Sequence, residues 1–534
     1  ENDNDIENKV LDKNSTELVS VAKKGEIDPV IGREKELNRT LEILLRRSKS
    51  NPIHVGEAGV GKTAIAQGLA LLIAQGKVPD RLLQAKIYSL DIAALLAGTK
   101  YRGDFEDRIK KLLGELGKEE NVILYIDEIH NLMGAGANNN GAMDASNLLK
   151  PYLAEQNIKF MGSTTYDEYK KWYWGLKDSL NPVNFNPEQW AEVMQDAGIK
   201  YMIFTTKHHD GFCTFDSKYT DFSIANGPFK NNPRKDVAFH VFDVFRKKGF
   251  MMGCYFSKPD WHCEWFWNPY FATANRRINY KKENHPDWWK NYQTFTQNQL
   301  DELMTRYGSF DILWLDGGWV TGDDINLDGI LEKARKQHPG LISVDRSIRG
   351  KNENYQTPER GIPETQLDYP WESCITLSND WGWVPNAPFK SPQKVINILS
   401  EITAKGGCLL LGVGPTADGV IEEEVTKRLH EVGKWLRFNG KAIYNTRITP
   451  VYRDGNVWFT ADKDGKTLYA IYALPEGEKL PEVIEWKGNL PKGNMKLLKG
   501  NKRVKYVLKG DKVEVTLPKG IENEPIALSF VLKK

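Results

Sequence analysis

Short apolar runs alternate with segments of helical spacing over most of this chain, and that alternation restricts it to an α/β fold. From about residue 187 to 440 the alternation is regular, with helical spacing at 187–198, 233–248, 288–307, 324–338, 391–405 and 421–438. The clearest apolar runs between them are KYMIFTT (200–206), GFMMGCYFS (249–257), FDILWLD (310–316), LISV (341–344) and CLLLGVG (408–414). A crossover helix over each parallel strand is typical of a (β/α) barrel. Fewer than eight good strands can be counted.

Tryptophan usage marks a boundary inside the chain, because the first of the sixteen tryptophans is Trp172. Before it, a separate α/β pattern contains the strand-like runs KIYSLDI (86–92) and NVILYIDEIH (121–130). After about residue 446, period-two runs separated by D-G and K-G-D turns predict a small antiparallel β-sandwich. We expect four parts: a polar linker or marginal helix at 1–26, an α/β domain at 27–171, a barrel at 172–445 and the β-sandwich at 446–534.

Composition excludes several classes of function. Lys and Arg number 73 against 71 Asp and Glu, so there is no basic field to attract nucleic acid. No run approaches the ~18–20 apolar residues of a membrane span, and the polar start ENDNDIENK predicts no secretory signal. Five scattered cysteines, without a CxxC pair or a Cys/His cluster, predict neither a disulfide framework nor a zinc site.

A phosphate-binding loop is the first motif with chemistry. The segment GEAGVGKT (56–63) follows the apolar run NPIHV and precedes the helical run AIAQGLALLIA. Gly56, Gly59 and Gly61 allow backbone N–H groups to converge on phosphate, while Lys62 reaches the outer phosphates and Thr63 offers a hydroxyl to Mg²⁺. A bare Gly-rich turn is the alternative reading of such a motif.

A pair of acids at the end of a second strand favours the nucleotide site over that alternative. In VILYIDEIH, Asp127 would hold the magnesium ion with Thr63, and Glu128 would orient the attacking water. Two acids at a strand end are otherwise a solvated turn. Together the two motifs predict that the first domain binds ATP and Mg²⁺.

Residues 27–171 resemble the first AAA+ module of the ClpA/ClpB/ClpC unfoldases. The resemblance rests on IDPVIGREKEL, GEAGVGKTAIAQGLA, LLAGTKYRGDFEDR, IDEIH and GSTTYDEY. It implies that Lys62 and Thr63 belong to Walker A, Asp127 and Glu128 to Walker B, and Thr165 to the sensor-1 position. It places the substrate-gripping pore loop at Lys100, Tyr101, Arg102 and Gly103.

The resemblance ends before the module is complete. After GSTTYDEYKK the family pattern calls for two arginine fingers, a last core strand and a helical lid, whereas this chain continues as WYWGLKDS. An arginine finger contributes roughly 10³–10⁵-fold to phosphoryl transfer. We therefore expect nucleotide binding with impaired ATP hydrolysis, and no hexameric unfoldase.

Polar residues cluster where two predicted barrel strands end. KYMIFTTKHHDGF delivers His208 and His209, and FDILWLDGGW delivers Asp316 beside two glycines. The strand ends of a parallel barrel are where catalytic groups gather. A His pair is alternatively a metal site or a pair of hydrogen-bonded core residues.

Residues 174–534 resemble glycoside hydrolase family 29, the retaining α-L-fucosidases, through TTKHHDGF, SKYTDFS, WLDGGW, YQTPER and WESCITLSNDWGW. The resemblance implies a fucosylated oligosaccharide as substrate, no cofactor, and Asp316 as the nucleophile. It also implies that His208 and His209 hydrogen-bond fucose hydroxyls and that Trp314 lines the pocket. Arg346, in SVDRS, falls near the family's pocket arginine.

The acid/base of such an enzyme is less clearly marked. Candidates are Glu359 in YQTPER, Glu364 in GIPE and Glu372 in WESC. We favour Glu359, because TPE is the motif of the linkage-selective branch that the chain resembles. Glu372 is then a substrate-binding or backbone-bound acid.

The family's first barrel strand, which ends in His-Trp-Gly, is not found in this sequence. A barrel without it would expose two strand edges, and we therefore expect impaired activity. The strand IKFMGSTT (158–165) could fill the vacancy only by leaving the ATPase sheet.

Three functional hypotheses remain from the sequence. The first is an α-L-fucosidase-like hydrolase fused to a truncated ATP-binding module, the second an AAA+ chaperone fragment, and the third an artificial chimera without a single function. The fucosidase resemblance implies a bacterial periplasmic or secreted enzyme and the Clp resemblance a cytoplasmic protein, so the compartment stays open.

Overall fold

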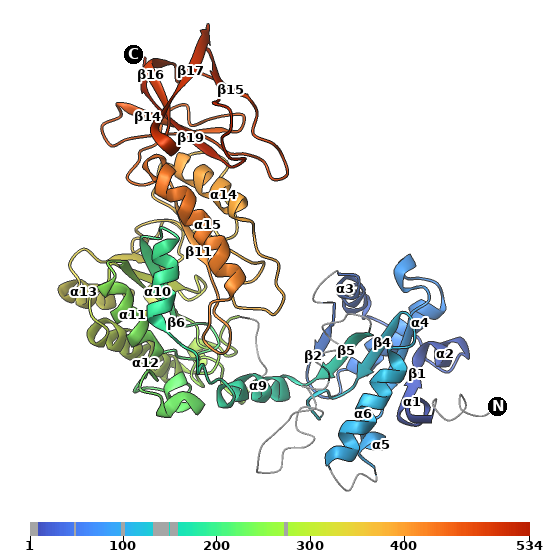
Figure 1. The fold of residues 1–534 in the computed structure, drawn as a ribbon. Coiled ribbons are helices and arrows are strands. Elements are labelled where there is room, and N and C mark those ends of the chain that lie inside the picture. Colours follow the sequence, from blue (N-terminus) through green and yellow to red (C-terminus); the bar gives the residue numbers. More distant parts are fainter. Residues whose placement is uncertain are drawn as a thin grey trace. The chain divides into compact units, whose positions relative to one another are not determined.

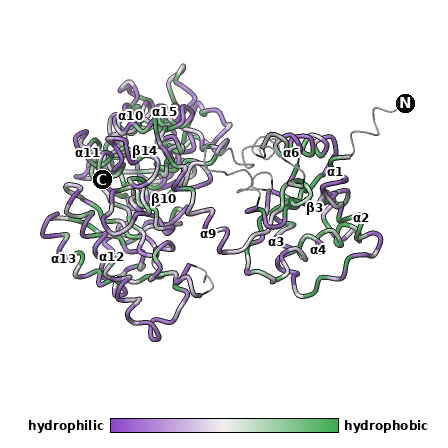
Figure 2. Tube along the Cα trace, turned by 90° about the horizontal axis from the view of Figure 1, so that it is seen from below, coloured by the Kyte–Doolittle hydropathy of each residue, from purple (hydrophilic) through white to green (hydrophobic). Residues whose placement is uncertain are grey.

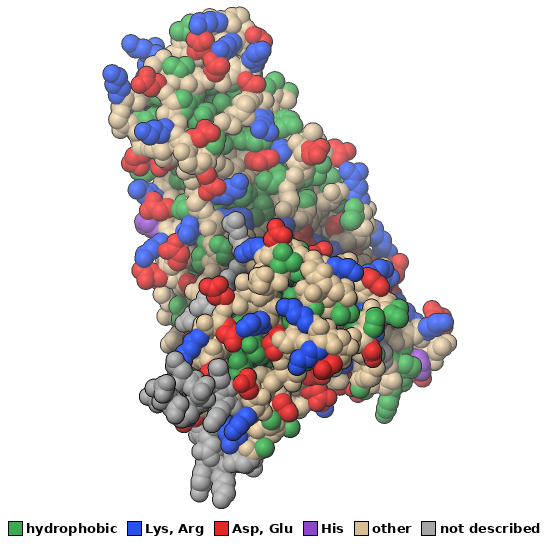
Figure 3. Space-filling view, turned by 90° about the vertical axis from the view of Figure 1, so that its right-hand side faces the viewer, with side chains coloured by type: hydrophobic (Ala, Val, Ile, Leu, Met, Phe, Trp, Pro, Cys, Tyr) green, Lys and Arg blue, Asp and Glu red, His purple; other side chains and the backbone are tan. Residues whose placement is uncertain are grey.

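The chain folds into two units in a computed structural model that describes residues 9–46, 50–97, 102–131, 149, 158–271 and 276–533. The units are residues 1–176 and 177–534, and each is described by itself. Within the described residues, no helix combines the length and the apolar character that crossing a membrane requires. Acidic and basic side chains are interspersed on the face drawn in Figure 3, in keeping with their nearly equal numbers.

The first unit is a five-stranded sheet in the order β1-β3-β4-β5-β2, covered on both faces by helices (Figure 1). Alternate residues of the buried strand β4 point to the two faces, so that Ile123 and Tyr125 join one core and Leu124 and Ile126 the other. The strands are β1 (Ser15–Glu17), β2 (Ile53–Val55), β3 (Lys86–Leu90), β4 (Val122–Ile126) and β5 (Ile158–Thr164). The helices are α1 (Lys9–Asn14), α2 (Leu18–Lys23), α3 (Glu34–Leu44), α4 (Lys62–Ala74), α5 (Ile92–Leu96), α6 (Arg102–Leu116) and α9 (Tyr166–Gly175).

Of the two alternatives for residues 1–26, a polar linker or a marginal helix, residues 9–23 follow the second, with two short helices and a strand between them. Strand β1 pairs antiparallel with β3, and helix α2 buries Leu18, Val19 and Ala22 against α4 and the sheet. The charged residues around these few apolar side chains hid the pattern, because the elements are only three to six residues long.

Strand β5 stays in the ATPase sheet. It pairs parallel with β4 on one side and with β2 on the other. Both of its edges are therefore occupied, and it does not fill a vacancy in the barrel.

The second unit contains the predicted parallel strands, and each of them except β9 is followed by a helix. Strands β6 to β9 form one parallel sheet, and β10 and β11 form a parallel pair. The strands are β6 (Tyr201–Lys207), β7 (Met251–Ser257), β8 (Ile312–Asp316), β9 (Ile342–Val344), β10 (Glu372–Thr376) and β11 (Cys408–Gly412). The helices are α10 (Pro187–Asp196), α11 (Val237–Lys247), α12 (Pro286–Arg306), α13 (Leu327–Gln337), α14 (Pro392–Ala404) and α15 (Glu423–Asn439). The apolar runs identified in the sequence did not include β10, which begins with a glutamate, so this strand was not predicted.

An extended segment, residues 354–360, joins β9 to β10 in the barrel wall. Asn354 N–H donates to Ser343 O of β9, and Cys374 N–H of β10 donates to Pro358 O. The wall thus runs through β6, β7, β8, β9, this segment, β10 and β11. Among the described residues, no strand pairs with the remaining edges of β6 and β11. The (β/α)-barrel prediction is confirmed in this partly open form.

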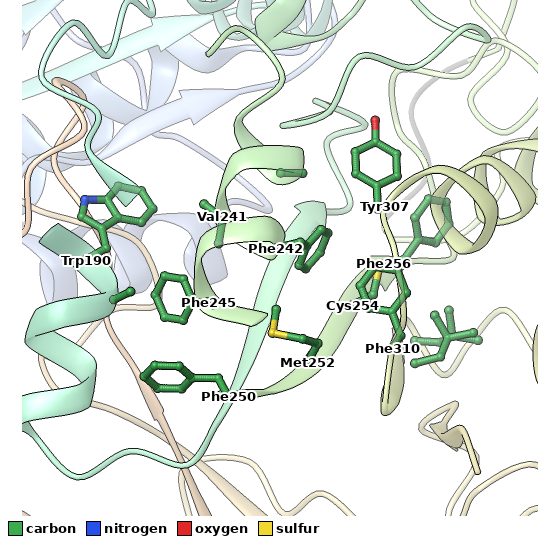
Figure 4. Packing of buried hydrophobic residues seen from close by; sticks show 14 of the residues in the cluster. Trp190, Val241, Phe242, Phe245, Phe250, Met252, Cys254, Phe256, Tyr307 and Phe310 are labelled. Carbon is green, nitrogen blue, oxygen red and sulfur yellow. The ribbon is translucent and has the colours of Figure 1, made fainter. Parts of the chain in front are cut away.

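Aromatic side chains fill the layer between the wall and its helices (Figure 4). Phe242 of α11 packs edge-to-face on Phe310, with ring centroids 4.8 Å apart, and on Phe204, 5.9 Å away. Phe245 and Trp190 extend the same cluster toward α10. Helices such as α12 and α13 alternate between hydrophilic and hydrophobic residues (Figure 2), as expected when one face covers a strand.

The C-terminal domain is one antiparallel sheet of eight strands folded over its own core. The order is β12-β13-β14-β19-β16-β17-β18-β15, and Phe459, Trp486 and Phe530 meet at its centre. The strands are β12 (Arg453–Asp454), β13 (Val457–Ala461), β14 (Thr467–Tyr472), β15 (Val483–Lys487), β16 (Pro491–Leu497), β17 (Lys502–Lys509), β18 (Lys512–Thr516) and β19 (Ile526–Leu532). The predicted antiparallel β-domain is confirmed.

Candidate functional site

Asp316 is the last residue of β8, and hydrogen bonds fix both of its carboxylate oxygens. Tyr255, on the neighbouring strand β7, donates its hydroxyl to Oδ2 at 2.7 Å. The N–H of Gly317 donates to Oδ1 at 2.7 Å. Gly317 has φ +82°, and a Cβ there would lie 2.2 Å from Pro259, so only glycine permits this turn.

The charge of Asp316 is favoured over its neutral form. Burial opposes ionisation, but the Tyr255 hydrogen bond and the guanidinium of Arg346 outweigh it and hold the pKa of Asp316 below its usual value. Arg346 Nε lies 3.6 Å from Asp316 Oδ1. Burial and the Asp316 charge raise the pKa of the Tyr255 hydroxyl, so it remains a donor.

Arg346 also binds Glu359. Its Nη2 lies 2.7 Å from Glu359 Oε2, and its Nη1 donates to the carbonyl of Thr357. The indole N–H of Trp381 donates to Glu359 Oε1 at 3.2 Å. One guanidinium therefore contacts both carboxylates and holds them near each other in one cavity.

The two histidines that follow β6 lie beside Asp316. His209 Nε2 is 3.8 Å from Asp316 Oδ2, and its Nδ1 is hydrogen-bonded to the hydroxyl of Ser257. Burial, together with the charge of His208, lowers the pKa of His209 to about 4, so the ring is neutral near pH 7. His208 stacks on Tyr255 at 5.9 Å. One ligand atom from each of His208, His209 and Asp316 falls within 4.8 Å of the others.

These groups line one cavity of about 1100 Å³. Its walls on this side are aromatic, and Trp314 stacks on Tyr255 at 5.2 Å beneath the Arg346 guanidinium. The residues gathered there are His208, His209, Tyr255, Trp261, Arg276, Trp314, Asp316, Trp319, Arg346, Glu359 and Trp381.

The other two candidate acids lie apart from this group. Glu372 is only 3% exposed and accepts hydrogen bonds from Tyr201 (2.6 Å) and from the indole of Trp314 (3.1 Å). Burial raises its pKa. Glu364 is exposed on the surface. Glu372 thus supports Trp314 from below, and its oxygens do not line the cavity.

Two residues that bind the carboxylates were missed from the sequence. Tyr255 lies within an apolar strand, where the sequence alone suggests an ordinary core residue. In the structure it pairs with Trp314 of the neighbouring strand, and both side chains point into the barrel. Trp381 belongs to the WGW stretch, which contributed to the resemblance to the fucosidases but was given no function in the site. Both act on partners far away in sequence.

In the first unit, the phosphate loop has the expected backbone. Gly59 and Gly61 have φ of +77° and +81°, and Gly61 caps helix α4. Lys62 Nζ folds back onto the carbonyls of Gly56 and Glu57, at 3.0 and 2.8 Å. The ammonium of Lys62 thus lies against the backbone of the loop itself.

Walker B residues lie next to the loop. Thr63 Oγ1 donates to Asp127 Oδ2 at 2.7 Å, and Ser163 donates to the other oxygen of Asp127. Paired hydroxyl and carboxylate oxygens fit Mg²⁺, which prefers oxygen ligands. Glu128 follows with φ +47° and accepts a bond from Asn131 at 3.0 Å.

The remaining Clp-type assignments have mixed outcomes. Thr165, the expected sensor-1 residue, accepts the N–H of Glu168 and caps α9. The neighbouring Ser163 contacts Asp127. Lys100 and Tyr101 of the expected pore loop lie outside the described residues. Arg102 and Gly103 begin helix α6.

A family model of α-L-fucosidases matches residues 140–441, which is more than half of the chain. The chain belongs to the α-L-fucosidase family. A second family model, of the ATPases associated with various cellular activities (AAA), matches residues 52–171 of this fucosidase-family chain.

Curated relatives match the first unit. The chain is 54% identical over 163 residues to the chaperone protein ClpB of Gloeobacter violaceus, covering 30% of this chain and 19% of that protein. It is 47% identical over 192 residues to ClpC/MecB of Bacillus subtilis, covering 36% of this chain and 23% of that protein. The chain thus spans about a fifth of the length of these relatives.

Solved fucosidase structures match about two thirds of the chain. α-L-Fucosidase isoenzyme 1 from Paenibacillus thiaminolyticus is 29% identical with a TM-score of 0.59, over 69% of this chain and 90% of that one. The α-fucosidase of Thermotoga maritima, solved in complex with fucose, is 27% identical with a TM-score of 0.56, over 67% of this chain and 82% of that one. The chain therefore joins a Clp-type AAA segment to a glycoside hydrolase domain, as the sequence predicted.

The buried position of Glu372 leads to a stability prediction. Replacing Glu372 with Ala leaves the buried indole N–H of Trp314 without an acceptor and leaves the Tyr201 hydroxyl only the longer contact with Leu409 O. It should lower the free energy of unfolding by about 3 kcal/mol. Urea unfolding followed by tryptophan fluorescence measures this, because nearly all tryptophans lie in the second unit. The control Glu364→Ala, at an exposed site, should change it by less than about 0.5 kcal/mol. Equal effects of the two substitutions would contradict the assignment.

Proposed function

We propose that the second unit is a retaining α-L-fucosidase, with Asp316 as nucleophile and Glu359 as general acid/base, which releases terminal α-linked L-fucose from oligosaccharides. The observation that carries the proposal is the contact of one guanidinium, that of Arg346, with both carboxylates. Retaining glycosidases require two carboxyl groups on one cleft, about 5–5.5 Å apart.

Asp316 is suited to attack the anomeric carbon because it is held ionised and immobile. Tyr255 and Gly317 each bind one of its oxygens, which fixes the orientation of the carboxylate. As the glycosyl–Asp316 ester forms, the glycosidic bond breaks and the negative charge of the carboxylate is lost. The Tyr255 hydroxyl remains hydrogen-bonded to Oδ2 while this charge decreases. The buried walls around it strengthen each of these interactions.

Glu359 is suited to serve the leaving group because it lies at the open side of the cavity. Its side chain is 45% exposed, against 19% for Asp316. A general acid must reach the glycosidic oxygen, and later activate a water at the same place, so it needs access to solvent. Glu372, sealed beneath Trp314, has no such access.

The surrounding residues supply recognition of a deoxy-sugar. The neutral ring of His209 and the adjacent His208 offer hydrogen bonds to hydroxyl groups. Trp261 and Trp319 both pack on His209 and present apolar surface. An apolar wall opposite polar groups matches a sugar with a methyl group on one side and hydroxyls on the other.

Removal of each carboxylate should give different products with azide. Asp316→Ala should lose activity on an aryl α-L-fucoside by at least about 10³-fold, and azide should then yield the β-fucosyl azide by a single displacement. Glu359→Ala should lose about 10²–10⁴-fold, and azide should intercept the covalent intermediate and yield the α-azide. Product analysis by NMR separates the two.

The matched variants are Glu364→Ala and Glu372→Ala, whose reactions azide should leave unchanged. Formation of the α-azide by Glu372→Ala, and not by Glu359→Ala, would overturn the acid/base assignment.

The Tyr255 hydrogen bond should be visible in the pH profile. Tyr255→Phe removes a donor that favours the charged form of Asp316, so the pKa of Asp316 rises and a smaller fraction is ionised at acid pH. The acid limb of kcat/KM should move to higher pH by about one unit. A profile that loses height without moving would show that Tyr255 does not act through the ionisation of Asp316.

A second function, binding of Mg·ATP by the first unit, is favoured by the Thr63–Asp127 pair beside the phosphate loop. Lys62, Thr63 and Asp127 would hold the outer phosphates and the ion, which supplies charge neutralisation when bound. The proposal covers binding alone, because the chain continues as WYWGLKDS where the Clp pattern has its arginine fingers.

Fluorescent ATP should bind the full chain with Mg²⁺ and lose at least about tenfold in affinity in Lys62→Ala. Lys77→Ala, at an exposed lysine on the same unit, is the control and should bind as the unsubstituted chain does. Equal binding by both variants would rule out the phosphate loop as the site.

A further inference from the structure

A groove runs along the barrel wall between β6 and β11. We define it by four residues, Tyr201 and Ile203 on β6 and Leu409 and Leu411 on β11, all of which line the cavity. The hydroxyl of Tyr201, whose shorter hydrogen bond goes to Glu372, also lies 3.3 Å from Leu409 O of β11. A full tyrosine side chain thus separates the two strands, where neighbouring strands of a sheet lie about 4.8 Å apart.

The backbone of both strands faces the groove with open hydrogen-bonding groups. In a parallel ladder, alternate residues bond to opposite neighbours. Met251 N–H binds Lys200 O, so Met202 also faces β7 while Ile203 faces the groove. Cys408 N–H binds Trp371 O, so Leu411 faces away from β10. No described residue binds the N–H and C=O groups of Ile203 and Leu411.

Burial of the strands supports the same picture. Residues 201–204 of β6 and 409–412 of β11 are all half-buried, whereas residues 312–315 of β8 and all of β10 are buried. The sequences of β6 and β11 are as apolar as those of the buried strands. Apolar side chains along the groove are therefore partly exposed to solvent, whereas equivalent side chains in β8 and β10 are covered.

The outer side of the groove is an apolar floor made by helices. Met194, Val241, Phe245, Leu399, Leu429 and Leu436, from α10, α11, α14 and α15, line the cavity there. A strand in the groove would place alternate side chains on this floor and the others in the barrel interior.

We propose that the groove binds an extended apolar peptide strand, donated by another polypeptide, that runs parallel to β6 and β11. Such a strand continues the β6–β9 ladder and the β10–β11 pair and joins them. Its N–H and C=O groups would meet Ile203 on one edge and Leu411 on the other, which an acyl chain or an apolar small molecule cannot do. The proposal rests on the wall and not on the catalytic assignment.

Cys408, at the start of β11, can report whether a peptide occupies the groove. It is exposed and lines the cavity, and the other four cysteines are buried. The probe is a blocked peptide of seven alternating valines and isoleucines with two lysines at each end for solubility. At saturation it should slow alkylation of Cys408 in the full chain by at least about tenfold, as burial of a reactive group does.

Two controls test the backbone pairing. The same peptide with alternate amides N-methylated cannot donate along one edge and should leave the alkylation rate within about twofold. In Ile203→Pro, the lost N–H faces the groove and not β7, so the ladder with β7 is kept and peptide affinity should fall at least about tenfold. Thermal unfolding of that variant checks its fold. No protection by the peptide, or equal protection by the methylated one, overturns the proposal.

Discussion

The contact of Arg346 with two carboxylates is the interaction on which the candidate active site depends. The guanidinium lies under partial burial between Asp316 and Glu359, where an unpaired charge of either sign is costly. It is placed there by a strained turn, since Arg346 has φ +62°. The buried ammonium of Lys258 donates to the carbonyl of Asp345 and so ties the turn to the end of β7. The geometry of the candidate site is therefore set by one loop and its two neighbouring strands.

The sequence predicted the strands, the helices and the position of Asp316 because each depends on local periodicity. Apolar runs of five to seven residues mark β6, β7, β8 and β11 directly. Strand β10 was not predicted, because its first residue, Glu372, is a buried acid. It is stabilised there by Tyr201 and Trp314, which are both far from it in the sequence. The roles of Tyr255 and Trp381 were not predicted for the same reason, because their partners are distant in the sequence. What a side chain contacts across the wall is set by strand register, which a single sequence does not display.

The first unit shows the opposite limit of sequence reasoning. Its phosphate loop and acid pair are local motifs, and the structure brings Thr63 and Asp127 to 2.7 Å as their pattern implies. The segment that contains β1 and α2 was instead predicted to be a linker or a marginal helix, without a strand, although the few apolar residues of α2 complete the core against α4. Short elements are stabilised by what they pack on, so their own sequence carries little signal.

The candidate site and the open wall can coexist because they use different parts of the barrel. The carboxylates and Arg346 lie on β8, on the loop after β9 and on residues 354–360, all within the continuous run of paired strands. Strand β6 contributes His208 and His209 from its end, and His209 is held from β7 by Ser257. Tyr201 meanwhile links β6 to β11 and to Glu372 beneath the site. The groove can therefore remain unpaired without displacing the residues that hold Asp316, and a strand bound in it would act first on the stability of the wall and only through Tyr201 on the chemistry.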